Sequence, residues 1–174
     1  MQALFDLISR FERPLLIIGG HALTVHGVMR QTVDLDCLIA VENRDAFDNH
    51  LRGGGFTQVS ATENFARYTH HSDMAPDVDI LFVDAPTLEK LLASATPLHR
   101  GEVELQVPSL PHLIALKLHA IRNNPAREAG DLGDIVRLLA ANPRAVCAEE
   151  LAAICQRFGP EGIEAKLQLI RNPQ

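Results

Sequence analysis

The sequence predicts a mixed α/β fold of the α+β type, in which a β-sheet flanked by helices precedes a helical C-terminal part. Up to about residue 108, short aliphatic runs bounded by Pro and Gly alternate with amphipathic segments. From residue 109 onward only helical periodicity remains. The 174 residues, 47% of them apolar, suffice for a core without disulfides. We therefore expect a core domain over 1–108 and a helical part over 109–174 packed on it.

The first elements follow from apolar spacing and from Pro and Gly. Leu4, Leu7 and Phe11 recur at helical spacing, and Pro14 ends that helix. The four aliphatic residues between Pro14 and the Gly-Gly pair are typical of a buried strand. We predict helices over 2–12 and from the Gly-Gly pair to Gly27, and strands over 15–18 and 33–40.

The remaining elements are delimited by capping residues, glycines and prolines. Asn43 is placed to cap a helix that the triple glycine ends, and Ser109 is placed to cap the first C-terminal helix. In order, we predict a helix over 44–52, strands over 56–59, 65–70 and 78–83, a helix over 87–95, a strand over 103–107, and helices over 110–122, 128–141, 148–158 and 161–171.

Composition narrows the classes of function. The chain has 16 Lys+Arg against 22 Asp+Glu, and the acidic excess lies within residues 31–90. A basic footprint for nucleic acid is absent, so any such contact has to be local. No apolar run approaches the ~20 residues that span a bilayer, and the N-terminus lacks a signal-peptide pattern, so we expect a cytoplasmic protein without a membrane partner. Three widely spaced cysteines predict reduced, mostly buried thiols.

Three aspartates on predicted strands form the most informative pattern. Asp34 and Asp36 share one face of a strand because side chains alternate, whereas Leu35 points into the core. If the strand that carries Asp79 lies alongside, three carboxylates converge, and such a set suits Mg²⁺ or Mn²⁺. The alternative for the Asp-x-Asp tripeptide is a solvated strand edge.

Gly19 and Gly20 stand between a predicted strand and a predicted helix. The missing Cβ atoms permit a tight turn and let backbone N–H groups approach an anion such as a nucleotide phosphate. The alternative is a plain strand-to-helix turn.

Together, these features resemble the nucleotidyltransferase superfamily, which has a DNA polymerase beta-like fold. Its pattern is Gly-[Gly/Ser], about ten residues, h-[DE]-h-[DE]-h and later h-[DE]-h. Gly19, Gly20, Asp34, Asp36 and Asp79 stand at the corresponding positions. The wider string IIGGHALTVHGVMRQTVDLDCLIA looks like the branch of abortive-infection and toxin-antitoxin nucleotidyltransferases. A later Lys helix and an Asp-x-x-Asp helix are similar to that branch as well.

The resemblance implies a nucleotidyltransferase-type mixed sheet and a two-metal transfer of a nucleoside monophosphate from a triphosphate to an acceptor hydroxyl. Asp34 and Asp36 would hold two Mg²⁺ or Mn²⁺ ions. Asp79 would ligate the ion that activates the hydroxyl. These three residues are the predicted catalytic and metal-binding residues.

Further residues are implied to bind the nucleotide, together with Gly19 and Gly20. Lys117 would reach the triphosphate, and its alternative is an exposed helix lysine. Arg30, two residues before Thr32, would clamp a phosphate or pair with a carboxylate. Thr32 belongs to the same motif. His21 would donate to a phosphate, or it merely packs.

Three more acids have less specific interpretations. Asp77 shares a strand face with Asp79 and is either an acid that supports the site or a solvated strand start. Asp131 and Asp134 lie three apart on one helix, so they share a face. In the resembled branch such acids line the cleft, and the alternatives are capping or solvation.

The function expected from the resemblance is therefore a metal-dependent nucleotidyltransferase. Its acceptor would be a tRNA end, a protein hydroxyl or a small molecule, and one tyrosine without tryptophan offers little stacking surface for RNA. A non-catalytic nucleotide-binding or protein-interaction relative, such as the partner of an operon-encoded protein, is the alternative. A third interpretation is a domain in which the acids are coincidental. A phosphohydrolase is disfavoured because no His-Asp array or P-loop is present.

Overall fold

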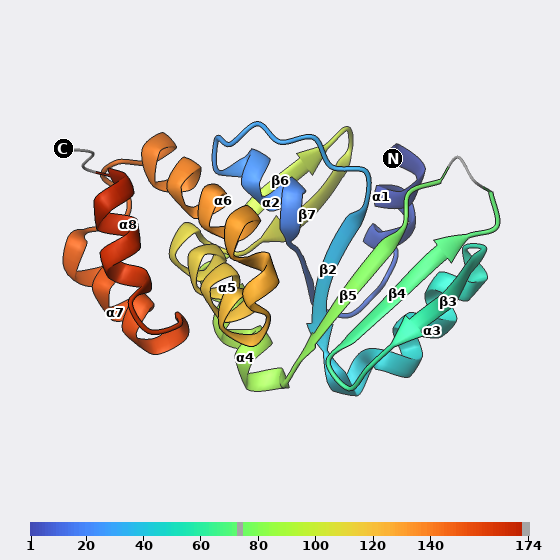
Figure 1. Ribbon diagram of the computed structural model, residues 1–174. Helices are drawn as coiled ribbons and strands as arrows, with labels where there is room; N and C mark the ends of the chain where they lie inside the picture. Colours follow the sequence, from blue (N-terminus) through green and yellow to red (C-terminus); the bar gives the residue numbers. More distant parts are fainter. Residues whose placement is uncertain (73–74, 172–174) are drawn as a thin grey trace. The chain divides into compact units, whose positions relative to one another are not determined.

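The computed structural model describes residues 1–72 and 75–171, and the chain forms two compact units (Figure 1). The first unit comprises Met1–Ala22 and Arg30–Pro108. The second comprises Leu23–Met29 and the chain from Ser109 onward. Each unit has its own apolar core.

The first unit is built on a five-stranded mixed sheet, which confirms the predicted α/β class. Its central strands pair in parallel and all the other neighbours are antiparallel. The spatial order is β1 (Leu15–Ile17), β2 (Leu35–Ala40), β5 (Val78–Val83), β4 (Phe65–His70) and β3 (Phe56–Ala61). The bounds of β4 and β5 are those predicted from alternation, and β3 continues two residues beyond its predicted end.

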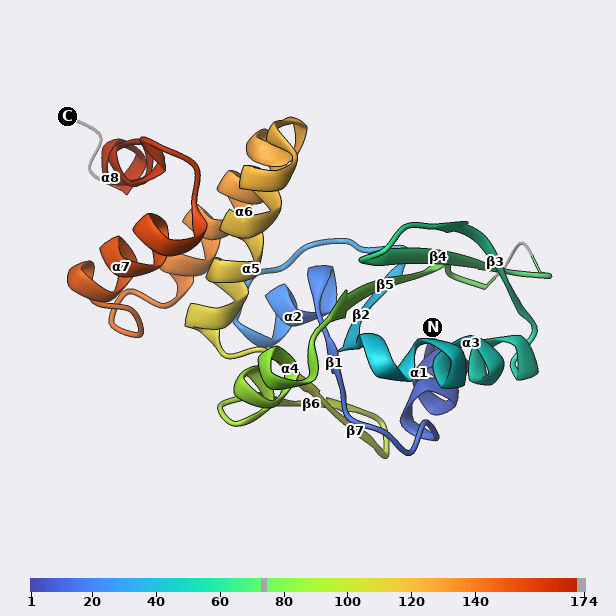
Figure 2. The same cartoon turned by 90° about the horizontal axis from the view of Figure 1, so that it is seen from below.

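Two helices cover one face of this sheet. Figure 2 shows α1 (Gln2–Ser9) and α3 (Arg44–Gly53) side by side on that face. The rings of Phe11 and Phe47 meet edge to face at 4.7 Å, and His50 Nε2 lies 2.8 Å from the carbonyl oxygen of Leu7. Buried side chains of β5, such as Ile80, alternate with half-buried ones along the strand, so the opposite face is left for polar groups.

The other elements of the first unit lie around the sheet. A 3₁₀ turn, η1 (Val41–Asn43), precedes α3. The helix α2 (Gly19–Val25) follows β1 and begins in this unit, whereas its residues from Leu23 onward belong to the second unit. The helix α4 (Ala85–Leu92) follows β5. Asp84 Oδ1 caps α4 by accepting from the Thr87 amide at 2.7 Å, which explains why the helix starts earlier than Pro86 alone predicted.

Three local predictions need correction. Ser109 precedes the helix that begins at Leu110, as predicted, but its side chain makes no capping hydrogen bond to that helix. The segment Thr96–Arg100 forms a strand, β6, that pairs with β7 (Val103–Val107) as an antiparallel hairpin. Sequence reasoning missed β6 because Pro97 interrupts it and Leu98 is its single buried apolar side chain. Asn43 makes no side-chain cap for α3, because its amide oxygen accepts from Arg13 Nη1 at 2.6 Å instead.

The second unit is helical. α5 (Leu110–Asn123) contacts both α6 (Glu128–Ala141) and α7 (Ala148–Phe158), and α8 (Ile163–Arg171) contacts α6 and α7, with the 3₁₀ turn η2 (Pro125–Arg127) between α5 and α6. Fully or nearly fully buried aliphatic side chains from α5 to α8 form its core: Ile114, Leu118, Ile135, Leu138, Leu151 and Leu167. The segment 23–29 joins this unit partly through Asn142 Nδ2, which donates to the His26 carbonyl at 2.8 Å.

The helices and thiols of the described residues are unexceptional. None of the described helices has both the length and the apolar character needed to cross a membrane. Cys37 and Cys155 are buried free thiols, as expected, whereas Cys147 is exposed. Burial raises the pKa of the Cys155 thiol to about 11.

Candidate functional site

The strands β2 and β5 bring two of the predicted carboxylates together. Asp36 is the register partner of Asp79 in the parallel pairing, and neighbouring strands lie about 4.8 Å apart. Both side chains are half-buried, whereas Leu35 and Cys37 on the opposite face of β2 are completely buried. The prediction that Asp36 faces away from the core is therefore confirmed, and the condition that the strand with Asp79 lies alongside is met.

Asp34 lies two residues before Asp36, ahead of the first residue of β2. Its carboxylate is half-buried, and its Oδ1 accepts a hydrogen bond from Thr32 Oγ1 at 2.9 Å. The same hydroxyl lies 3.3 Å from the Asp34 carbonyl oxygen. Thr32 therefore orients the carboxylate of Asp34. In the motif Thr-x-Asp-x-Asp, the threonine hydroxyl thus supports the first aspartate.

The glycine pair packs against this acidic motif. Gly19 has φ of +61°, a conformation that L side chains rarely adopt, and a Cβ there would overlap the Oδ2 of Asp36. A Cβ on Gly20 would lie 2.6 Å from the Cβ of Thr32. The missing side chains thus make room for Asp36 and Thr32. This packing gives the two glycines a more specific role than that of a plain strand-to-helix turn.

The third carboxylate has a partner that the sequence did not reveal. Arg67 on β4 is the register partner of Asp79 on β5. Its Nε donates to Oδ1 of Asp79 at 2.7 Å, and its Nη2 donates to Oδ2 at 2.6 Å. This fork raises the pKa of the Arg67 guanidinium, which therefore keeps its charge.

The donor chemistry of this motif fits a hard divalent cation, because three carboxylates come from one end of two adjacent strands. Asp36 is also seated against Gly19, where a side chain would displace it. However, both oxygens of Asp79 are engaged by Arg67. Within the part of the chain that the structure describes, no group of three or more His, Cys, Asp or Glu side chains is arranged to hold a metal ion.

Two other predicted nucleotide-binding residues have contrasting environments. His21 is only 7% exposed, and its ring meets the Phe5 ring edge to face at 5.1 Å, so it packs into the core. Its Nε2 is buried and, among the described residues, has no hydrogen-bond partner. Burial, together with the nearby positive charge of Arg100, lowers the pKa of His21 despite the opposing effect of Asp34. Arg30 is exposed.

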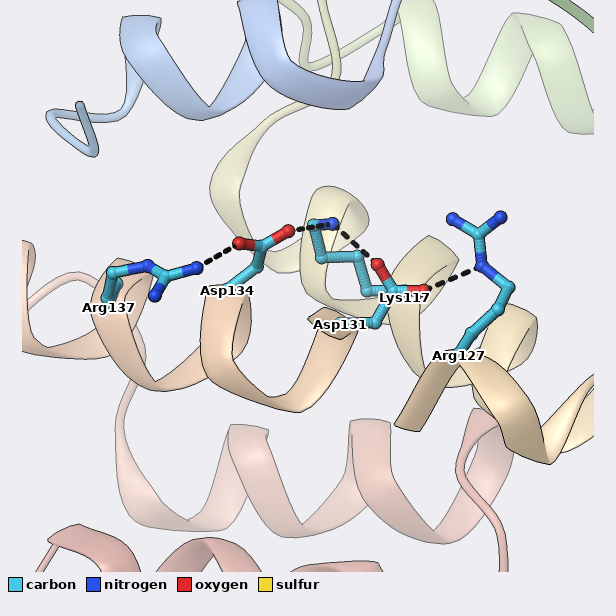
Figure 3. A network of polar contacts seen from close by, with 5 residues as sticks. All are labelled: Lys117, Arg127, Asp131, Asp134 and Arg137. Atoms are coloured by element: carbon cyan, nitrogen blue, oxygen red, sulfur yellow. Dashed lines mark hydrogen bonds and ion pairs between the residues drawn. The ribbon is translucent and has the colours of Figure 1, made fainter. Parts of the chain in front are cut away.

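The predicted triphosphate lysine lies in the second unit, on α5. Lys117 is 7% exposed, and its ammonium donates to Asp131 Oδ1 at 2.9 Å and to Asp134 Oδ2 at 2.8 Å (Figure 3). It is therefore not an exposed helix lysine. Asp131 and Asp134 are 5% and 1% exposed, so they are not solvated acids either.

Figure 3 shows that the three residues are part of a longer chain of charges. Arg127 Nε donates to Asp131 Oδ2 at 2.8 Å, and Arg137 Nη2 donates to Asp134 Oδ1. Each buried carboxylate thus has one buried and one exposed cationic partner. Lys117 binding to a nucleotide stays a prediction.

Arg67 is the residue of this site that sequence reasoning missed. It is the one charged residue of β4, and it alternates with the buried Ala66 and Tyr68. That alternation places it on the polar face of its strand. The pairing of β4 with β5, which brings it to Asp79, is a tertiary feature with no local signal.

Known structures share this fold. An antigenic nucleotidyltransferase-like protein from Paracoccidioides brasiliensis is 18% identical over 95% of this chain and 89% of its own, with a TM-score of 0.57. The antibiotic-resistance factor ANT(2'')-Ia is 14% identical over 96% of both chains, with a TM-score of 0.64. A lincosamide antibiotic adenylyltransferase with bound lincomycin is 13% identical over 81% of this chain and 95% of its own, with a TM-score of 0.57.

No protein-family model matches the chain, and no curated protein matches it significantly. The similarity therefore concerns the fold. The chain has the nucleotidyltransferase fold, which confirms the fold predicted from the glycine and aspartate motifs. The assignment to the toxin-antitoxin branch stays a prediction.

Proposed function

We infer that the protein is a metal-dependent nucleotidyltransferase. The observation that carries this inference is the register pairing of Asp36 with Asp79, with Asp34 two residues upstream and Gly19 seated against Asp36. The nucleotidyltransferase fold of the chain and the nucleotidyltransferases among its structural neighbours support it.

In the proposed reaction, an acceptor hydroxyl oxygen forms a bond to the α-phosphorus of a nucleoside triphosphate. The bond between that phosphorus and the bridging oxygen to the β-phosphorus breaks, pyrophosphate leaves, and the hydroxyl loses its proton. Asp34 and Asp36 would hold divalent cations, with Asp79 as the third carboxylate. Such cations supply charge neutralisation at the attacking and leaving oxygens.

The residues of the chain have distinct parts in this proposal. Thr32 keeps Asp34 oriented through its hydroxyl. Gly19 allows the backbone to approach Asp36. Arg30 remains the candidate for a phosphate contact in the first unit, because it carries a positive charge that a triphosphate requires. Lys117 belongs to the second unit, and its phosphate contact stays a separate prediction.

A hydroxylated small molecule is the first acceptor class to test. Two of the structural neighbours are an antibiotic-resistance factor and a lincosamide antibiotic adenylyltransferase, and the similarity covers 96% and 95% of their chains. The scarcity of aromatic residues, 5% of the chain, gives RNA bases little stacking surface. A tRNA end or a protein hydroxyl is the other acceptor class.

One observation favours a second candidate function, a non-catalytic nucleotide-binding or protein-interaction module. Arg67 engages both oxygens of Asp79, as a permanent counter-charge would in a site that never binds a metal. The two functions differ in their dependence on Mg²⁺.

The test is calorimetric titration of ATP, CTP, GTP and UTP into the wild type, Asp34→Asn and Asp36→Asn, each with and without Mg²⁺. Asp45→Asn is the matched control, since it removes the same charge from an exposed position of the first unit. We expect binding that requires Mg²⁺, disappears in both site variants and persists in the control. Circular dichroism should show that every variant stays folded, because removal of one of several neighbouring carboxylates reduces repulsion.

Nucleotide binding that is unaffected by Mg²⁺ and by both variants would favour the non-catalytic module. Pyrophosphate release from the triphosphate that binds, measured with hydroxylated small molecules and then with RNA, would identify the acceptor class.

A further inference from the structure

The pair formed by Arg67 and Asp79 extends the carboxylate site by one strand. Arg67 on β4, Asp79 on β5 and Asp36 on β2 are successive register partners, so the three side chains leave the same face of the sheet. A guanidinium and a carboxylate therefore flank Asp79 on its two sides.

The guanidinium of Arg67 is a cation close to Asp79, Asp77 and Asp34. Asp79 raises the pKa of Arg67 most strongly, through hydrogen bonds and charge, and Asp77 and Asp34 raise it further. Arg67 thus lies in the field of three carboxylates, where a divalent cation would also be most strongly attracted.

The two partners differ in their exposure to water. The side chain of Asp79 is 12% exposed, whereas that of Arg67 is 44% exposed. Because the Arg67 side chain is in contact with solvent, its guanidinium is able to leave the ion pair and become hydrated. The less exposed carboxylate of Asp79 stays in place and then needs another cation.

We propose that Arg67 is a positioning residue that holds Asp79 and competes with a divalent cation for it. While the fork is closed, Arg67 occupies a lone pair on each oxygen of Asp79 and compensates its charge, so cation binding relies mainly on Asp34 and Asp36. Full engagement of Asp79 by the cation requires Arg67 to open the fork, because both compete for the same charge. This inference rests on the proposed function, since it concerns the same metal site.

The consequence is that Arg67 lowers the affinity of the protein for divalent cations. Removal of the guanidinium in Arg67→Gln should increase the affinity for Mn²⁺ on the order of tenfold, because a charge-assisted fork no longer has to open. Arg67→Lys keeps the charge but loses the fork, so its affinity should lie between those of the wild type and Arg67→Gln.

The experiment is titration of Mn²⁺ alone, with free Mn²⁺ measured by electron paramagnetic resonance. It compares the wild type, Arg67→Gln, Arg67→Lys, Asp79→Asn and the double variant Arg67→Gln/Asp79→Asn. Arg52→Gln is the matched control because Arg52 Nε pairs with Asp48 at 2.6 Å in the same unit and is similarly exposed, at 51%. Thermal unfolding verifies that each variant is folded, and if Arg67→Gln is not, Arg67→Lys decides.

The expected result is tighter Mn²⁺ binding in Arg67→Gln, an intermediate effect in Arg67→Lys and none in Arg52→Gln. In the Asp79→Asn background the Arg67 substitution should change the affinity less than about twofold, since the two residues act through one pair. Equal affinities of Arg67→Gln and the wild type would overturn the proposal. So would an equal gain in Arg52→Gln or in the Asp79→Asn background.

A further variant, Asp36→Asn, separates this inference from the proposed function. If Mn²⁺ binding disappears in Asp36→Asn while Arg67→Gln has no effect, the metal site stands and only the role of Arg67 fails. If none of the proteins binds Mn²⁺, both the inference and the metal dependence of the proposed function fail.

Discussion

Asp36 of β2 lies directly beside Asp79 of β5, as register partners in the one parallel strand pair among the described strands. Like charges at such positions repel each other unless a cation compensates them. The Arg67 guanidinium provides that compensation at Asp79. The arrangement explains how the fold tolerates adjacent carboxylates, and it suggests substitutions that separate stability from ligand binding.

Gly19→Ala should destabilise the first unit and displace Asp36. An alanine at φ of +61° is strained, and its Cβ would overlap the Asp36 carboxylate. We expect a loss of at least about 2 kcal/mol in the free energy of unfolding. Urea denaturation measures it. Gly53→Ala is the control, because Gly53 lies in α3 and a Cβ there meets no atom within 4 Å. Equal stabilities of the two variants would contradict the packing argument.

Lys117→Met should destabilise the second unit, because it leaves two buried carboxylates without their shared cation. Removal of one partner from a buried ion pair costs about 3 kcal/mol or more. Arg127 and Arg137 remain bonded to the acids, so we expect a loss near that lower value, measured by urea denaturation.

Lys166→Met serves as the control for Lys117→Met. Lys166 pairs with Glu128 at 2.6 Å in the same unit, but the two side chains are 53% and 33% exposed. Exposed pairs of this kind contribute less than about 1 kcal/mol. A stability loss for Lys117→Met no larger than this control would show that the buried network is not a stabilising centre.

Thr32→Val should weaken the binding of the Mg²⁺–nucleotide complex without unfolding the chain. Valine has nearly the shape of threonine but lacks the hydroxyl that donates to Asp34 Oδ1 at 2.9 Å. A hydrogen bond to a charged group contributes about 1.5 kcal/mol, which corresponds to roughly tenfold in affinity. Calorimetry measures the change, and Thr32→Ser, which keeps the hydroxyl, should bind almost normally. Equal affinities of the two variants would exclude an orienting role for Thr32.

His21 should make the folded state less stable in mild acid. Its pKa is lowered by burial, then by Arg100, relative to the value near 6.5 of an unfolded chain. The unfolded chain therefore binds the proton first as the pH falls, and stability decreases from about pH 6.5 down to the lowered pKa. Above pH 6.5 this contribution is fully retained.

We expect His21→Leu to lose less stability than the wild type between about pH 7.5 and pH 5.5 in urea denaturation. The exposed His99 on β6 provides the control, and His99→Gln should keep the wild-type pH dependence. If His21→Leu and the wild type lose the same stability, His21 is not the group responsible.

Local patterns predicted most of the strands and helices. The alternation of apolar and polar residues predicts β5, and the aliphatic run bounded by Pro14 and Gly19 predicts β1. The strand β6 was not predicted, because Pro97 interrupts its pattern and, among the described strands, it pairs with β7 alone. The prediction that Asn43 caps α3 is wrong because its side-chain oxygen accepts a hydrogen bond from Arg13, which is distant in the sequence.

By itself, the sequence determined that Asp36 alternates with the buried Leu35 and Cys37, that glycines precede it, and that the motif order resembles that of nucleotidyltransferases; Asp34, predicted on the same strand, lies just ahead of β2. These features depend on alternation and backbone sterics, which are local. Only the tertiary structure decided that Arg67 meets Asp79 and that Lys117 is buried between Asp131 and Asp134. The physical reason is that strand register and helix packing are set by burial of the whole apolar surface, so the neighbours of a charged side chain cannot be predicted from its own segment.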